Sequence, residues 1–155
     1  MTFLMAAMLV GGLTGLDGTY HESRSGQQEG QGVQKAAAAG KSTMKVHYID
    51  VGQGSAVLVQ SGVHFMLIDG GDSDASSKVV SYLKRQKVKK LDYVVVSHYD
   101  SDHLNGVVGA LNVFKVKRVI APAYTADSRV YESYCNIIAQ KKIATTRPKV
   151  GKKYK

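Results

Sequence analysis

The sequence predicts an α/β fold, in which a mixed sheet carries helices on its outer face. Three observations lead to this prediction. Residues 44–68 hold short apolar runs separated by tight turns, residues 91–121 hold apolar runs that alternate with helical patterns, and the second group follows the first. A meander followed by alternating strands and helices is typical of such a sheet. The chain has 155 residues, 44% of them hydrophobic, which is enough for one domain with a buried core.

The meander begins at residue 44. Residues 44–51 (MKVHYIDV) alternate well enough for a strand, and residues 55–60 and 63–68 form two more strands, joined at the tight Ser61-Gly62 turn. Gly52-Gln53-Gly54 lacks the third glycine and the following helix of a dinucleotide-binding loop. We therefore expect these glycines to serve the backbone, through positive φ angles or close packing.

Helices and strands alternate in the second part of the sheet. Asp72 or Asp74 can cap a helix over residues 75–88, which has one apolar stripe and one charged face. Residues 91–96 (LDYVVV) predict a continuous apolar strand, covered on both faces. The other expected elements are a helix over residues 104–114, a strand over 116–121 and a helix over 128–141.

The amino-terminal part of the chain differs from the rest. Residues 3–16 carry no charge, and this run is shorter than the roughly 20 residues of a membrane span but suits the core of a secretory signal. Residues 17–43 are rich in Gly, Gln, Ser and Ala, which is typical of a linker. We expect a signal-like segment (1–16), a flexible linker (17–43) and a folded part (44–155) of an extracytoplasmic protein, secreted or tethered. The alternative is a buried apolar segment of a cytosolic protein.

The net charge of +9 lies in the folded part. It concentrates in residues 84–90 (KRQKVKK) and in the last fifteen residues. Such runs favour a polyanion or an anionic membrane surface. The alternative is a solubilising face, because no aromatic residue interrupts the first run as a stacking platform requires. We infer no stable protein partner, and we expect membrane association only through the amino-terminal segment.

The strongest chemical signal is SHYDSDHLNG, residues 97–106, directly after a predicted strand. His98, Asp100, Asp102 and His103 supply two imidazoles and two carboxylates, which suit Zn, Mn or Fe. In a loop leaving a strand, the first two can point one way and the last two toward a neighbouring point, which suits two adjacent metals. A metal would also offset the repulsion between the carboxylates. The alternative is a polar turn whose Asp and His side chains cap the next helix.

Asp69-Gly70-Gly71 also follows a predicted strand. A simple turn is one explanation for this triplet. Because side chains at strand ends can converge on one edge of a sheet, the Asp69 carboxylate can instead join the cluster of residues 98–103.

SHYDSDHLNG resembles the metal-binding motif of the metallo-β-lactamase superfamily, HxHxDH followed by two glycines. IDVGQGSAVLV (49–59) and LIDGG (67–71) precede it in the right order and resemble the extracytoplasmic domain of ComEC-type DNA-uptake (competence) proteins and their free-standing relatives. The resemblance implies the first half of an αββα sandwich. It also implies two divalent metal ions, Zn or Mn, that activate a water for hydrolysis.

The resemblance also assigns roles to individual residues. His98 and Asp100 would bind the first ion, and Asp102 and His103 the second. Asp102 would also be catalytic by orienting the nucleophile, and Asp69 would be a carboxylate behind the metal ligands or a structural one.

Four features depart from the family pattern. Asp100 stands where the superfamily has histidine, which favours harder metals such as Mn. Ser55 replaces an acidic residue, and Asn105 replaces the first glycine after the motif, where asparagine tolerates a left-handed backbone. The superfamily completes its sites with a later histidine, a bridging aspartate and a further histidine, whereas no histidine follows His103.

These departures shape the predicted function. We expect a fragment that lacks the carboxyl-terminal half of the domain and is inactive alone, because each metal would be under-coordinated. The full-length protein would hydrolyse phosphodiesters, with DNA the favoured substrate. The alternative is a non-catalytic basic module that binds nucleic acid or an anionic surface.

Overall fold

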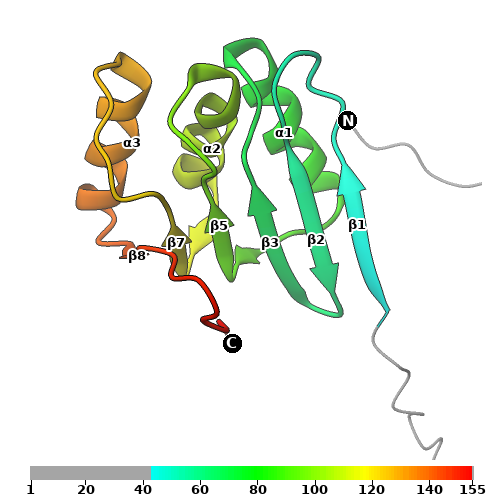
Figure 1. Ribbon diagram of the computed structural model, residues 1–155. Helices are drawn as coiled ribbons and strands as arrows, with labels where there is room; N and C mark the ends of the chain where they lie inside the picture. The colour runs from blue at the N-terminus through cyan, green and yellow to red at the C-terminus, as the bar shows by residue number, and fades with distance from the viewer. Residues whose placement is uncertain (1–42, 155) are drawn as a thin grey trace, which may run out of the picture. The chain divides into compact units, whose positions relative to one another are not determined.

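A mixed β-sheet with three helices on one face forms the part of the chain that the computed structural model describes, residues 43–154 (Figure 1). The predicted signal-like segment and linker, residues 1–16 and 17–43, lie outside these residues except for Thr43. No helix within residues 43–154 has the length and apolarity needed to cross a bilayer. The elements are, in chain order, β1 (Met44–Tyr48), β2 (Val57–Ser61), β3 (His64–Ile68), α1 (Ser73–Arg85), β4 (Lys90–Leu91), β5 (Tyr93–Val95), α2 (Ser101–Val113), β6 (Lys115–Val116), β7 (Arg118–Ile120), α3 (Arg129–Gln140) and β8 (Ala144–Thr146).

The strand order of the main sheet is β1-β2-β3-β5-β7-β8. β1, β2 and β3 are antiparallel neighbours, whereas β3, β5, β7 and β8 run parallel. A helix connects each successive parallel pair, and every crossover moves the same way across the sheet. Because such crossovers are right-handed, all three helices lie on one face (Figure 1). The predicted α/β class and the helices on the outer face are confirmed.

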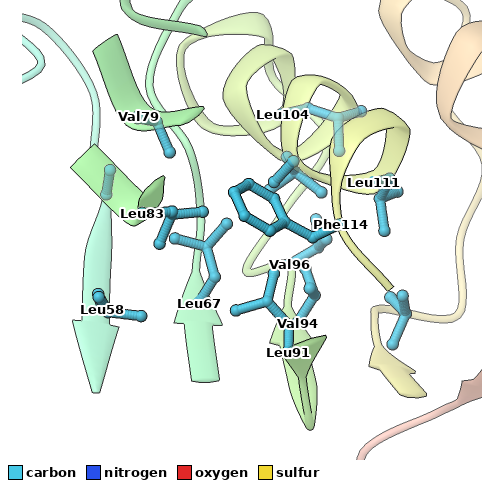
Figure 2. Close-up of a cluster of buried hydrophobic side chains, with 14 of the residues drawn as sticks. Leu58, Leu67, Val79, Leu83, Leu91, Val94, Val96, Leu104, Leu111 and Phe114 are labelled. Carbon is cyan, nitrogen blue, oxygen red and sulfur yellow. The ribbon is translucent and has the colours of Figure 1, made fainter. Parts of the chain in front are cut away.

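The hydrophobic core lies between this face and the helices. Figure 2 shows Leu58 and Leu67 of the sheet on the side of α1, which carries Val79 and Leu83, whereas Val94 lies nearer Phe114 at the end of α2. All of these side chains are buried, and all but Phe114 fully so. A fully buried side chain of this size contributes about 1.5–3 kcal/mol to folding, so this layer fixes the helices against β2, β3 and β5.

The other face of the sheet is also apolar, but no helix of residues 43–154 covers it (Figure 1). At its β1 edge, Met44, Val46 and Tyr48 are 69%, 44% and 83% exposed. Cross-strand pairing continues this face to half-buried Val59 and Met66. Several exposed apolar side chains on one sheet face indicate a face that another element covers.

The segment 91–96 differs from the prediction. Instead of one strand covered on both faces, it holds the end of β4 and all of β5, which belong to different sheets. Asp92 separates them, because its carboxylate accepts hydrogen bonds from Lys90 Nζ (2.9 Å) and His64 Nδ1 (3.0 Å). Burial favours a raised pKa for Asp92, but these bonds and one from the Phe65 N–H lower its pKa below the ordinary 3.8.

The helices begin at somewhat different residues from those predicted. α1 begins at Ser73 because the Asp72 carboxylate accepts from the Ser73 N–H at 2.6 Å, which selects one of the two predicted caps. α2 begins at Ser101, three residues before the predicted start, so the motif runs into this helix. α3 begins after its Ser128 cap, as expected within one residue. β8 was not predicted, because its sequence Ala-Thr-Thr carries no apolar run.

Candidate metal centre

The three sequence motifs meet at one edge of the sheet, beyond the ends of β3 and β5. Backbone hydrogen bonds join them: the Gly70 N–H donates to the His103 carbonyl (2.8 Å), and the Ser55 N–H to the Asp102 carbonyl (3.4 Å). The Gly71 N–H completes the set by donating to the Ser55 carbonyl at 2.8 Å. The motifs therefore act as one structural unit, although they are up to about 50 residues apart in the chain.

Glycines allow this close approach. A Cβ atom on Gly54, whose φ is +96°, would collide with the Asp102 carbonyl. A Cβ atom on Gly106 in α2 would collide with the Gly70 carbonyl. The predicted backbone role is thereby confirmed for the 52–54 stretch, in which Gly52 also has a positive φ of +71°.

Asp69 is a buried carboxylate, 3% exposed, at the centre of this edge. Its Oδ1 accepts from the Ser97 N–H at 2.8 Å, and its Oδ2 accepts from Ser97 Oγ at 2.7 Å and from His103 Nδ1 at 3.0 Å. Its backbone has φ +54°, a left-handed conformation that aspartate tolerates better than most residues. The carboxylate thus lies directly behind one histidine of the motif.

The same hydrogen bonds fix the tautomers of both motif histidines. Ser97 Oγ has one hydrogen and donates it to Asp69, so it accepts from His98 Nδ1 at 2.9 Å. His103 Nδ1 donates to the carboxylate directly. When neutral, both imidazoles therefore carry the hydrogen on Nδ1 and a lone pair on Nε2. Their ring centroids lie 4.0 Å apart.

Each Nε2 lies beside a carboxylate. His98 Nε2 is 3.5 Å from Asp100 Oδ2, and His103 Nε2 is 3.8 Å from Asp102 Oδ2. These are the two pairs that the sequence analysis grouped. The second pair differs in one respect from the prediction, since it lies in the first turn of α2 rather than in a loop.

The capping alternative does not describe Asp100. This residue occupies the N-cap position of α2, yet its side chain makes no capping hydrogen bond and is 76% exposed. Only its backbone carbonyl joins the helix, by accepting from the His103 and Leu104 N–H groups. An aspartate at an N-cap normally uses its side chain, so the position of this carboxylate near His98 needs another reason.

The types of donor atom in the two pairs suit a divalent metal. The number of ligands in each pair is smaller than a metal site usually has. Imidazole nitrogens and carboxylate oxygens suit Zn and Mn, and a catalytic zinc usually has three protein ligands. Within residues 43–154, no group of three or more His, Cys, Asp or Glu side chains is placed to hold a metal ion. Each pair offers two ligands.

Three features of this edge were not found from the sequence. The bridging role of Ser97 was missed, and its place directly before His98 was the available signal. Asn105 does not need a left-handed backbone, because it lies in α2 and its Nδ2 donates to Asp72 Oδ1 of α1 at 2.9 Å. Tyr99, between the two ligands of the first pair, is buried, and burial raises its pKa to about 12.

The first basic run lies away from this edge. α1 begins beside the motif, where Asp72 contacts Asn105, and residues 84–90 begin in its last turn and continue beyond it. Thirteen helical residues span about 20 Å, so the run lies roughly that far from the motif. Exposed Lys115 and Lys117 join it, since β6 pairs with β4.

A mixed sheet with a polar site at the carboxyl ends of its parallel strands defines a protein of the α/β class. The chain belongs to the metallo-β-lactamase superfamily, whose family model matches residues 49–150. A Thermotoga maritima structure assigned to the metallo-β-lactamases has a similar fold, with a TM-score of 0.54 and 13% identity. The match covers 72% of this chain and 62% of that one.

Two curated relatives confirm the predicted likeness to ComEC-type competence proteins. Recombination protein 2 of Haemophilus influenzae is 30% identical over 100 residues, which cover 61% of this chain and 13% of that protein. Competence protein ComA of Neisseria gonorrhoeae is 41% identical over 58 residues, which cover 37% of this chain and 8% of that protein. The matched part of the chain thus spans a small share of either relative.

Proposed function

We propose that the full-length protein is a metal-dependent hydrolase of phosphodiesters and that this chain supplies half of its ligand set. The supporting observation is the fixed tautomer of His98 and His103, whose Nε2 lone pairs lie beside carboxylates. An imidazole held from behind by a carboxylate, as His103 is held by Asp69, is the usual arrangement of a histidine metal ligand.

The proposal assigns a role to each member of the two pairs. His98 and Asp100 would bind one divalent ion, and Asp102 and His103 the other, with Zn or Mn as the candidates. Two such ions, when bound, supply an activated water and stabilise the charge that develops on a phosphate. Asp102 would orient that water by accepting a hydrogen bond from it.

DNA is the proposed substrate, and two observations favour it. The chain is similar to a recombination protein and to a competence protein. It also carries a net charge of +9, which favours a polyanionic substrate.

The missing ligands would come from further chain, in a second sheet that packs on the open apolar face. That second sheet would bury the Met44 and Tyr48 side chains, which are exposed here.

The test compares the 155-residue chain with an extended chain that includes the downstream coding region. Bound Zn and Mn are measured by mass spectrometry, and hydrolysis is measured on fluorescent DNA. We expect weak metal binding and no turnover from the short chain, and turnover that chelator abolishes from the long one. Full turnover by the short chain would contradict the half-site.

A variant pair tests the ligands themselves. His98→Ala combined with Asp102→Ala should remove metal binding. His64→Ala is the matched control, because this histidine also pairs with an aspartate, but its side chain is 73% exposed and lies at the start of β3, the end opposite the motif. Equal metal binding by both variants would refute the ligand assignment.

The alternative function is a binding module that uses the basic edge formed by residues 84–90, Lys115 and Lys117. The observation that favours it is the distance of this edge from the motif, since a polyanion can bind there without contacting the proposed metals. Binding that falls steeply with salt and ignores chelator would support the module. Turnover that chelator abolishes would support the hydrolase.

A further inference from the structure

A cavity lies beside the motif, between the motif loop, the turn after β7 and helix α3. It has a volume of about 300 Å³. We call it the tyrosine pocket, because Tyr99, Tyr124, Tyr131 and Tyr134 line it together with Arg147. It opens at the carboxyl ends of β5 and β7, the edge at which open α/β sheets bind ligands.

Tyr99 joins the pocket to the proposed metal ligands. Its ring centroid lies 5.0 Å from that of Tyr124, 4.6 Å from Tyr131 and 5.7 Å from Tyr134. Its backbone N–H donates to the Tyr124 hydroxyl at 3.1 Å. Because Tyr99 stands between His98 and Asp100, a ligand in this pocket would contact the same loop that carries the first ligand pair.

The pocket has both an exposed rim and a polar group inside. Tyr124 is 49% exposed, so part of its ring is accessible from solvent. Tyr134 is 4% exposed, and its buried hydroxyl has no hydrogen-bond partner among residues 43–154. A phenylalanine at this position would avoid the cost of an unpaired buried hydroxyl. The hydroxyl therefore has hydrogen-bonding capacity that a ligand with a polar edge could use.

We propose that the tyrosine pocket binds a nucleobase of the DNA strand whose phosphodiester lies at the motif, an inference that rests on the proposed function. Bases are planar and stack on tyrosine rings, which favours Tyr124 as the stacking surface. The edge of a base carries the donors and acceptors that the Tyr134 hydroxyl lacks. Arg147 supplies a cation for the adjoining phosphate. A purely apolar ligand would fill the volume but leave the hydroxyl unpaired.

The experiment measures binding of a fluorescent single-stranded oligonucleotide to the 155-residue chain in the presence of chelator. An abasic oligonucleotide of the same length is the reference, and both are measured at one salt concentration so that phosphate contacts cancel in the ratio. We expect the abasic strand to bind about 5- to 150-fold more weakly, the range for one stacked base. Tyr124→Ala should remove most of this difference.

Two further variants separate binding from folding. Tyr134→Phe keeps the shape of the pocket and removes only the hydroxyl, so it should weaken binding of the normal strand and leave the abasic strand unchanged. Tyr48→Ala removes a tyrosine that is 83% exposed on β1, outside the pocket, and should leave both unchanged.

The outcomes distinguish this inference from the proposed function. Equal binding of normal and abasic strands, or equal effects of Tyr124→Ala and Tyr48→Ala, would overturn the pocket assignment even if the extended chain hydrolyses DNA. Base-dependent binding that Tyr124→Ala removes would support the pocket even if no hydrolysis is found, and the proposed function alone would then fail.

Discussion

Replacing Asp69 with asparagine should invert the hydrogen bonds behind the two motif histidines. Asparagine keeps the carbonyl oxygen that accepts from the Ser97 N–H, and it tolerates the left-handed backbone at this position. Its Nδ2 group, however, donates where the carboxylate accepted. Ser97 Oγ must then accept from it, and both imidazoles must accept at Nδ1 and carry their hydrogen on Nε2. The lone pairs that the proposed metals need would be lost.

The cost to folding can be worked from the three hydrogen bonds to Asp69. A bond to a charged group contributes about 1.5–3 kcal/mol and a neutral one about 0.5–1.5 kcal/mol, so each bond loses about 1 kcal/mol. Removing a buried charge returns part of this loss. We expect a net destabilisation of about 1–2 kcal/mol, which lowers the folding equilibrium constant by about five- to thirty-fold.

Two measurements on the metal-free chain check this prediction. Long-range ¹⁵N NMR of the histidines at about pH 8 should show Nδ1–H imidazoles in the original chain and Nε2–H imidazoles in Asp69→Asn. Urea unfolding gives the stability difference. Asp127→Asn, at an exposed aspartate, is the control and should change stability by less than about 0.5 kcal/mol. Unchanged tautomers together with a control-like stability would refute the reasoning.

Two further predictions concern stability. Gly106→Ala should destabilise the chain by about 1–3 kcal/mol, because the added Cβ collides with the Gly70 backbone. Gly109→Ala in the same helix is the control: its Cβ meets the movable Ser76 hydroxyl, so this change should be neutral or stabilising by up to about 1 kcal/mol. Equal effects of the two variants in urea unfolding would contradict this prediction. The lowered pKa of Asp92 means that its stabilisation is present above pH 3.8 and is lost as pH falls through the folded-state pKa. The stability difference between the original chain and Asp92→Asn should therefore shrink as the pH falls through 3.8 and below, and a constant difference would disprove it.

Periodicity predicted the elements whose burial differs between faces. The stripe with Val79 and Leu83 is buried, as the helical pattern indicates, and β2 and β3 alternate between the core face and the open face. β8 was missed because an edge strand of small polar residues is held by backbone pairing to β7 rather than by apolar side chains. The break at Asp92 was missed because one partner of its carboxylate is His64, which lies 28 residues away in the sequence.

For the site, the sequence identified the donors but not how they are held. His98, Asp100, Asp102 and His103 do form two adjacent pairs. The sequence did not show the tautomers, since these depend on a serine whose bond to Asp69 exists only after β3 and β5 pair. Their roles as metal ligands stay a prediction.

The strand order has a consequence for folding during synthesis. Each strand of the main sheet lies beside the one that precedes it in this sheet, from β1 to β8. No strand must wait for a later one to find its neighbour, so the sheet can grow in the order in which the chain emerges. Asp69, Ser97 and both motif histidines are all in place once α2 has emerged. We expect this polar centre to form before α3 and β8 exist.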